Sequence, residues 1–325
     1  MERILITGGS GFIGTNLVEK LRHGHNEIVC ADVIEPKDSR HRAIWTRLDV
    51  TDEKNVFDVF KRFQPSQVYH LGARTDLASD NVGDYLANTR GVAHIANAAG
   101  EFSVKRVIFC SSRLVCRIGY QPKSDTDYCP TTAYGESKVI GENIVRRLGT
   151  ASYDWAIVRP TSIWGPWFDV PYRQFFDTVR NRKYVHPGER VVNKSFGYVG
   201  NSVFQLEALM GCDTARFARK TFYIGDYQPV ELRDFATRIS AAFGEKGVFR
   251  LPVGMLWLAA LAGDVLKRLG YRNPALTTFR LNNLLMPMLH DFQDLEAITG
   301  PLPHSLDDGI RRTVDWMRSR ESGAA

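Results

Sequence analysis

Tyr134 and Lys138 are the two residues whose types and spacing best suit catalysis. They lie four positions apart, which puts both side chains on one face of a helix. An ammonium group beside a phenol stabilises phenolate, so Lys138 is expected to lower the pKa of Tyr134 from its usual ~10 toward working pH. Ser111 and Ser112 end a predicted strand, and a serine hydroxyl there could bind the same substrate oxygen. Ser112, Tyr134 and Lys138 are therefore candidate catalytic residues for moving a proton while a hydride moves at the adjacent carbon.

The stretch from Thr7 to Gly14, TGGSGFIG, could hold the cofactor for such a reaction. It follows a short apolar run and leads into a segment whose apolar residues recur at helical spacing. Gly8 permits the turn, Gly11 lets backbone N–H groups approach a pyrophosphate, and Gly14 lets the helix pack closely. A second predicted strand ends in Asp32, where a carboxylate can bind the adenosine ribose hydroxyls. This order predicts a dinucleotide site, and a positively charged nicotinamide nearby would lower the tyrosine pKa further.

Length and composition fit a globular protein with one large core and a smaller second unit. The chain has 325 residues, of which 44% are hydrophobic and 24% are charged. Its net charge of +6 comes from 42 basic and 36 acidic residues, which are spread along the chain without a basic block. Nucleic-acid binding is therefore disfavoured, and an anionic small molecule suits the charge balance better.

The cysteines and the apolar segments bear on the compartment. Five cysteines show no paired metal-ligand spacing and their number is odd, so we expect no metal site, no disulfide framework and a cytoplasmic location. No cleaved signal is expected before the first strand. The most apolar segment, residues 253–262, is interrupted by Asp264 and is shorter than the ~20 residues that span a bilayer, so we expect no integral membrane segment. We interpret it as a packed helix, and the alternative is a membrane-surface helix edged by Lys267 and Arg268.

Apolar strands alternate with helical patterns over the first half of the chain. Predicted strands cover residues 4–6, 27–31, 45–48, 67–71, 106–109 and 155–158, and predicted helices cover 12–21, 56–63, 85–99 and 133–148. Such alternation gives βαβ units, and therefore an α/β fold with a doubly wound parallel sheet. Ligands in that architecture bind at the carboxyl ends of the strands.

Beyond Arg159 and Pro160 the pattern loosens into short elements separated by stretches rich in Pro and Gly. We expect residues 1–165 to form the dinucleotide-binding domain and residues 166–320 to form mainly a smaller C-terminal substrate-binding unit. Segments around 195–225 are expected to return to the first domain.

The chain resembles an extended short-chain dehydrogenase/reductase of the NAD-dependent epimerase/dehydratase type over nearly its whole length. The matching motifs are TGGSGFIG, Asp32, Asp49-Val50-Thr51-Asp52, His70-Leu71-Gly72-Ala73, Asn88-Thr89-Arg90-Gly91, Ser111-Ser112, Tyr134 to Lys138, Arg159-Pro160 with Gly165-Pro166, and Ser305 to Ile310. The resemblance implies a Rossmann-type fold, NAD or NADP as the cofactor, and commonly a homodimer built from paired helices.

The resemblance also implies a role for individual residues. Tyr134 would be the acid/base, Lys138 would also hold the nicotinamide ribose, and Ser112 would be the partner hydroxyl. The cofactor would contact the glycine-rich turn, the strand ends and the catalytic helix, at Gly8, Gly11, Phe12, Ile13, Gly14, Asp32, Asp49, Val50, Leu71, Ala73, Tyr134 and Lys138. Because a carboxylate at the end of the second strand repels a 2′-phosphate, NAD is expected in preference to NADP. Arg40 and Arg42, in the loop that follows, are the residues that argue the other way.

The chain departs from the family pattern around the substrate. Ser162 stands where sugar-nucleotide enzymes often place an Asn that contacts the diphosphate, and Gly200-Asn201 replaces a usual pair of Asp residues. Lys194 matches a position where such enzymes carry a phosphate-contacting Arg, and the alternative is a solvated loop lysine. Ser112, Ser162 and Lys194 are therefore the candidate substrate-binding residues.

Three functions fit these residues. The one we expect is a nucleotide-sugar epimerase or 4-ketosugar reductase acting at ring C4. A dehydrogenase of hydrophobic alcohols, related to the hydroxysteroid branch, would suit Ser162 and the apolar segment 253–262. A dinucleotide-sensing protein without chemistry is disfavoured because the catalytic residues are intact. A sugar 4,6-dehydratase is also disfavoured, because Arg113 and Leu114 replace the acidic pair that such enzymes carry after the partner hydroxyl.

Overall fold

A parallel seven-stranded sheet forms the larger part of the computed structural model, which describes residues 1–148, 152–169, 172–271 and 276–322. The strand order is β11-β6-β5-β4-β1-β2-β3. The strands are β1 (Arg3–Thr7), β2 (Glu27–Asp32), β3 (Trp45–Arg47), β4 (Gln67–His70), β5 (Arg106–Cys110), β6 (Asp154–Pro160) and β11 (Lys220–Ile224). All neighbouring strands run parallel, which confirms the predicted Rossmann-type α/β fold.

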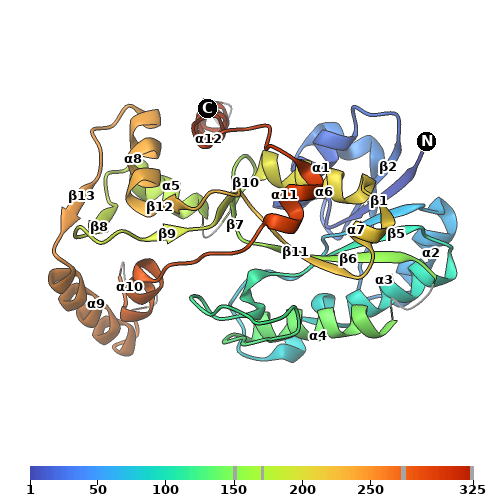
Figure 1. The fold of residues 1–325 in the computed structure, drawn as a ribbon, viewed down its shortest axis with the longest axis horizontal. Helices are drawn as coiled ribbons and strands as arrows, with labels where there is room; N and C mark the ends of the chain where they lie inside the picture. Colours follow the sequence, from blue (N-terminus) through green and yellow to red (C-terminus); the bar gives the residue numbers. More distant parts are fainter. Residues whose placement is uncertain (149–151, 170–171, 272–275, 323–325) are drawn as a thin grey trace.

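Helices cover both faces of this sheet (Figure 1). One layer consists of α2 (Glu53–Phe63), α3 (Arg90–Glu101) and α4 (Ala133–Leu148), and the other of α1 (Phe12–Leu21), α6 (Val199–Gly211) and α11 (Gln293–Thr299). Successive strand residues alternate between the two resulting cores, since Ile4 and Ile6 pack in one and Leu5 in the other. The sheet is therefore apolar on both faces, as the continuous apolar strand sequences predicted.

The rest of the chain forms a smaller lobe at the carboxyl end of the sheet (Figure 1). Its strands are β7 (Ser162–Trp164), β8 (Val185–Pro187), β9 (Asn193–Lys194), β10 (Phe196–Tyr198), β12 (Val230–Glu231) and β13 (Phe249–Leu251), and they pair as β7 with β10, β8 with β13 and β9 with β12. Its helices are α5 (Tyr172–Arg180), α8 (Leu232–Phe243), α9 (Val253–Arg268), α10 (Thr278–Leu285) and α12 (Leu306–Ser322). Trp164 is fully buried at its centre, among the rings of Phe176, Tyr198 and Phe235.

Two later segments join the first part of the chain. β11 extends the sheet beside β6, and α6 packs against α1. A four-residue helix, α7 (Thr214–Phe217), lies between them in sequence. The division of the chain at residue 165 stays a prediction.

The predicted helix over residues 85–99 is wrong in its first part. Short 3₁₀ turns cover Val82–Asp84 and Leu86–Asn88, and α3 begins only at Arg90. Asn88 explains the break, because its side chain is bound elsewhere: Oδ1 accepts from the backbone N of Arg74 and Nδ2 donates to the backbone O of Arg74, both at 2.9 Å. It also donates to Ser137, so this loop is anchored beside α4, the helix that carries Tyr134 and Lys138.

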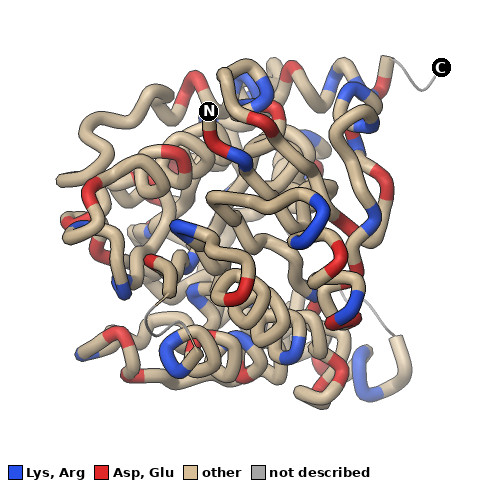
Figure 2. The backbone as a smooth tube through the Cα atoms, turned by 90° about the vertical axis from the view of Figure 1, so that its right-hand side faces the viewer, with Lys and Arg blue, Asp and Glu red and all other residues tan. Residues whose placement is uncertain are grey.

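The packed helix predicted at residues 253–262 is present, but only one face of it packs. Leu256 and Ala260 are buried against Leu281 and Leu285 of α10. The opposite face is exposed, which a run of apolar residues alone could not reveal. No helix among the described residues is long and apolar enough to cross a membrane. Figure 2 shows basic and acidic residues intermixed along the backbone, as the sequence indicated.

Candidate active site

The glycine-rich turn joins β1 to α1 in a conformation that only small residues permit. Gly8 has a positive φ of 71°, and a Cβ on it would lie 2.5 Å from the backbone N of Gly72. A Cβ on Gly14 would lie 2.1 Å from the carbonyl oxygen of Gly8, so α1 packs directly on the turn. Gly11 is the N-cap residue, and Phe12 and Ile13 begin the helix. The unpaired N–H groups at this helix start suit a pyrophosphate.

Asp32 ends β2 beside this turn. Its carboxylate accepts hydrogen bonds from the backbone N of Ser10 at 3.0 Å and of Ile34 at 3.4 Å. Burial raises the pKa of Asp32, and these backbone hydrogen bonds oppose that effect. The side chain is thus fixed at the strand end where an adenosine ribose is expected.

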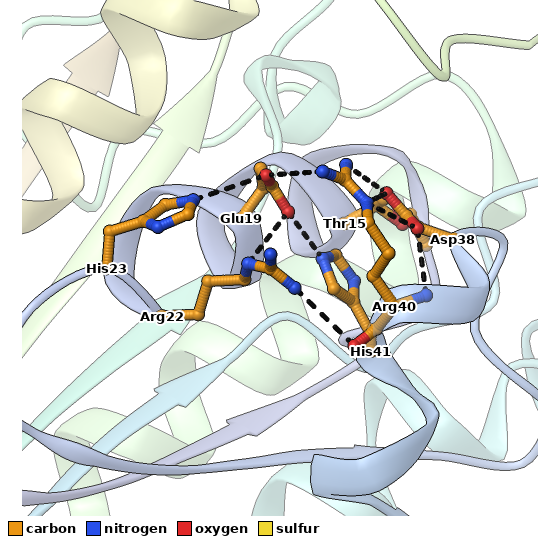
Figure 3. Close-up of polar contacts among 8 residues, drawn as sticks. Thr15, Glu19, Arg22, His23, Asp38, Arg40 and His41 are labelled. Carbon is orange, nitrogen blue, oxygen red and sulfur yellow. Dashed lines mark hydrogen bonds and ion pairs between the residues drawn. The ribbon is translucent and has the colours of Figure 1, made fainter.

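The two arginines that follow Asp32 are bound to carboxylates. Figure 3 shows the contacts of the first of them, Arg40. Arg40 makes a close ion pair with Asp38 at 2.6 Å and a second one with Glu19 at 3.2 Å. The hydrogen bonds from Arg40 lower the pKa of Asp38 to about 2. Arg42 pairs with Glu35 at 3.0 Å. Both guanidinium groups are therefore already paired with carboxylates, which makes them less available to bind the 2′-phosphate of NADP.

The other expected cofactor residues lie at neighbouring strand ends. Asp49 follows β3, and its Oδ1 accepts from the backbone N and the hydroxyl of Thr51, at 2.9 and 2.7 Å. Val50 is buried, and Leu71 and Ala73 are half-buried after β4. The sheet therefore brings these residues to the same edge as the glycine-rich turn.

Ser112, Tyr134 and Lys138 come together where β5 ends against α4. Lys138 Nζ donates to the carbonyl oxygen of Cys110, the last residue of β5, at 2.9 Å. The same ammonium lies 5.9 Å from the centroid of the Tyr134 ring. Ser112 lies close enough to the Tyr134 phenol to favour its phenolate by hydrogen bonding, and its Oγ accepts from the backbone N of Leu114 at 3.1 Å. All three side chains are largely buried, so each is fixed by packing as well as by hydrogen bonds.

The pKa of Tyr134 is raised, which corrects the expectation that Lys138 lowers it. Burial disfavours the phenolate more strongly than the hydrogen bond from Ser112 favours it, and Arg113 helps only weakly. Burial likewise lowers the pKa of Lys138. The tyrosine is therefore a phenol with a proton to give in the structure as it stands.

The two other candidate substrate residues lie in the smaller lobe. Ser162 begins β7 and is 3% exposed, and its Oγ accepts from the Tyr172 hydroxyl at 2.6 Å. Lys194 is 7% exposed, and its Nζ donates to the backbone oxygens of Asn283 at 2.8 Å and Met286 at 2.9 Å. Burial, with a contribution from the charge of Arg113, lowers the pKa of Lys194 to about 8. The solvated loop lysine that the sequence left open is thus excluded.

Comparison with known families identifies the family of this chain. Residues 4–194 match the model of the NAD dependent epimerase/dehydratase family, which is more than half of the chain. The chain belongs to this family. It is therefore an NAD-dependent enzyme, and the glycine turn and Asp32 fit that cofactor in shape and in hydrogen bonding.

Family members with different named activities are similar to this chain. The UDP-glucose 4-epimerase of Vibrio cholerae is 27% identical over 81% of this chain and 82% of its own length. The decarboxylating sterol-4-alpha-carboxylate 3-dehydrogenase erg26 of Schizosaccharomyces pombe is 26% identical over 98% of both chains. The crystal structure of UDP-glucose 4-epimerase from Thermus thermophilus, in complex with NAD, has a TM-score of 0.74 and 20% identity over 97% of this chain and 99% of that chain. The chain has the same fold as the Thermus thermophilus enzyme. The relatives include both a UDP-glucose epimerase and a sterol dehydrogenase, so both substrate classes are represented among them.

Sequence reasoning missed a buried group behind the candidate catalytic residues. Glu142, four residues after Lys138 on α4, accepts from the Ser111 hydroxyl at 2.6 Å and pairs with Arg159. Tyr128 donates to the other Glu142 oxygen at 2.8 Å. A signal was available, because Tyr134, Lys138 and Glu142 share one helical face, and a carboxylate on a buried face needs partners.

His70, in a motif matched to the family, is also buried beside Lys138. Its Nδ1 hydrogen bonds to the Thr7 hydroxyl at 2.7 Å, which links the ends of β1 and β4. Burial and the nearby Lys138 lower the pKa of His70 to about 3. It is therefore neutral at ordinary pH and adds no charge to the site.

One group of potential metal ligands occurs among the described residues: Glu19, Asp38 and His41. Its carboxylates are already paired with Arg40, and Glu19 also accepts from His41 at 2.9 Å (Figure 3). A cation there would have to displace a guanidinium. We assign this group to holding the loop after β2 in place.

Proposed function

We propose that this chain is an NAD-dependent nucleotide-sugar 4-epimerase or 4-ketosugar reductase. The observation that carries the proposal is the convergence of Ser112, Tyr134 and Lys138 at the end of β5, within reach of one substrate oxygen. We assign cofactor contacts to the glycine turn, Asp32, Asp49, Val50, Leu71 and Ala73, as expected above.

The protein groups divide the work at the reacting carbon. When the ketone is reduced, Tyr134 donates its phenol proton to O4. When the alcohol is oxidised, it takes the O4 proton as the deprotonated phenolate. Ser112 holds the same oxygen, and Lys138 supplies positive charge beside the phenol as proton transfer begins. NAD, when bound, accepts or donates the C4 hydride and places a positive charge near the site in its oxidised form. In an epimerase the transient ketone must turn over before reduction, whereas a reductase releases the alcohol.

Positive charge in the substrate lobe supports an anionic substrate. Lys194 carries its proton below about pH 8 and Arg113 is close enough to affect the pKa of Lys194. A diphosphate would be attracted to both groups. We propose a nucleotide sugar on this basis, with a cytoplasmic homodimer as the working form and no nucleic-acid partner. A 4,6-dehydratase stays disfavoured, since neither Arg113 nor Leu114 can act as the required base.

A dehydrogenase of a hydrophobic alcohol is the second candidate. The Ser162 hydroxyl accepts a hydrogen bond from the Tyr172 hydroxyl and donates one to the sulfur of Met288 at 3.8 Å. The weakly polar methionine side chain beside Ser162 suits a hydrophobic substrate better than a charged one. The relative from S. pombe is a named sterol dehydrogenase.

Thermal unfolding with a ligand panel separates the two candidates. Uridine and thymidine diphosphates and their hexose derivatives should raise the melting temperature in the presence of NAD, because a ligand that binds only the folded state stabilises it. Stabilisation by 3β-hydroxysterols alone would overturn the first proposal in favour of the second. Uridine diphosphate should also bind more weakly above pH 8, where Lys194 loses its charge. Lys194→Met should abolish that pH dependence. Lys194→Arg should also remove it from the pH range of the experiment, because a guanidinium keeps its charge well above pH 8.

A further inference from the structure

Helix α9 carries a continuous apolar stripe on the outside of the substrate lobe. Six large apolar side chains on the helix and at its end are between 48% and 78% exposed: Met255, Leu258, Leu261, Val265, Leu266 and Leu269. Apart from one adjacent pair, they follow one another at intervals of three or four residues, which places them on one side of the helix. Exposed apolar stripes of this size mark binding surfaces rather than ordinary surface.

The stripe is not part of the contact between α9 and α10. Leu256 and Ala260 fill that contact from the opposite side of α9 and are at most 7% exposed. Asp264, the only acidic residue of α9, accepts from the hydroxyl of Thr278 at 2.6 Å and so belongs to the α10 side. The exposed side of α9 therefore carries no carboxylate.

Positive charge lies at the end of the stripe. Lys267 and Arg268 are exposed in the last turn of α9, and neither has an ion-pair partner within the described part of the chain. Tyr271, 60% exposed, follows them. Apolar side chains beside cationic and aromatic ones match the layers of a lipid surface, in which acyl chains lie beneath anionic headgroups.

The length of α9 decides how it could meet a bilayer. Its 16 residues extend for about 24 Å at ~1.5 Å per residue, which is less than the ~30 Å hydrocarbon thickness. The helix could lie in the membrane surface but could not cross it.

We propose that the exposed stripe of α9 docks on the surface of an anionic lipid bilayer. The apolar side chains enter the boundary between headgroups and acyl chains, and Lys267 and Arg268 contact headgroup phosphates. Charge complementarity favours this occupant over a second copy of the stripe, because two copies would bring the same cationic ends to one interface when they pack in parallel.

Docking there would hold the substrate lobe against the membrane. The helix packed on α9 supplies the Asn283 carbonyl that Lys194 binds, and the following segment supplies Met286 and the Met288 neighbour of Ser162. Figure 1 shows α9 and α10 together at the end of the lobe far from the sheet. The site would thus receive substrates that reside at a membrane surface. This inference requires neither of the two substrate classes proposed above.

Vesicle co-sedimentation tests the proposal without substrate. Wild-type protein should sediment with vesicles of four parts phosphatidylcholine to one part phosphatidylglycerol (~20% anionic lipid) and less with phosphatidylcholine alone. The double variant Leu258→Glu/Leu269→Glu should bind at least ~10-fold more weakly, because it places two charges in the apolar layer. Lys267→Glu/Arg268→Glu should remove the preference for anionic vesicles.

Matched controls separate docking from misfolding. Leu77→Glu introduces the same charge at an apolar side chain that is 60% exposed and lies outside α9, and it should bind vesicles like the wild type. All variants should keep the wild-type melting temperature. The proposal is overturned if the wild type binds neither vesicle, or if the α9 variants bind as it does. It is also overturned if sedimentation velocity shows that the α9 variants convert a dimer to a monomer while vesicle binding is absent.

Discussion

The Glu142 carboxylate and the Arg159 guanidinium form a two-point ion pair that is almost fully buried between α4 and β6. Nε and one terminal nitrogen of Arg159 donate to the two carboxylate oxygens, at 2.8 and 2.7 Å. Glu142 is 2% exposed and Arg159 is 1% exposed. Because Glu142 also accepts from Ser111, this pair connects the helix that carries Tyr134 and Lys138 to the strand end that carries Ser112.

Glu142→Gln should destabilise the fold by about 3–5 kcal/mol, since it leaves the Arg159 charge buried without its counter-ion. Urea unfolding measures the change. Asp177→Asn is the matched control, because it breaks a partly exposed pair with Arg173 and should cost at most about 1 kcal/mol. Equal losses of unfolding free energy in the two variants would show that the buried pair contributes no more to stability than the partly exposed one.

Tyr134→Phe should lower turnover by ~10² or more while NAD affinity changes little, because it removes the hydroxyl that transfers the proton and keeps the ring. Lys138→Met should reduce both turnover and NAD affinity. Steady-state kinetics and calorimetric titration with NAD provide the two readouts. Tyr120→Phe removes a hydroxyl that hydrogen bonds only to Asp127 among the described residues, and it should leave both unchanged. Near-normal turnover by Tyr134→Phe would refute its assignment as the acid/base.

The enzyme should bind NAD more tightly than NADP, because Asp32 repels a 2′-phosphate and Arg40 is held by Asp38 and Glu19. Asp38→Ala should remove the closest partner of Arg40 and so reduce the preference of the enzyme for NAD over NADP. The double variant Asp38→Ala/Arg40→Ala should restore the preference for NAD, because it removes the released guanidinium as well. Calorimetric titration with both cofactors decides the matter, and tighter binding of NADP by the wild type would contradict the prediction.

Asn201→Asp should destabilise the protein more at pH 8 than at pH 5. Asn201 Nδ2 donates to Asp226 Oδ1 at 2.8 Å, and burial raises the pKa of Asp226 to about 6. At pH 8 the variant would place two carboxylates together, whereas at pH 5 Asp226 keeps a proton that the pair can share. Unfolding at both pH values tests this. Asn201→Ala is the control, because it lacks the added charge and should show a smaller change with pH; equal pH dependence of the two variants would exclude the repulsion.

The sequence predicted the helix that carries Tyr134 and Lys138, and its predicted bounds, Ala133 and Leu148, are the observed ones. It also placed the glycine turn and the strand ends, because these features depend on local spacing and on the parallel order of βαβ units. The fold was therefore predictable over its first half.

Features that depend on distant residues were not predictable in this way. The pairing of Glu142 with Arg159, the two carbonyl acceptors of Lys194 and the break at Asn88 each require knowledge of which segments meet. The favoured interpretation of residues 253–262 as a packed helix missed the exposed face of α9, because the hydrophobicity of a segment does not show which of its faces is covered. The raised pKa of Tyr134 follows from burial, which the pattern of four-residue spacing does not report.

NMR of the reaction with nucleotide hexoses in heavy water tests the central claim most directly. Purified enzyme with NAD should invert C4 of a nucleotide hexose, or with NADH should reduce a supplied 4-keto sugar, and Tyr134→Phe should lose this activity. A 4-keto-6-deoxy product with deuterium at C5 would contradict the site as described, because Arg113 and Leu114 offer no base for that proton. Oxidation of a sterol alcohol with no turnover of any nucleotide sugar would contradict the proposed substrate.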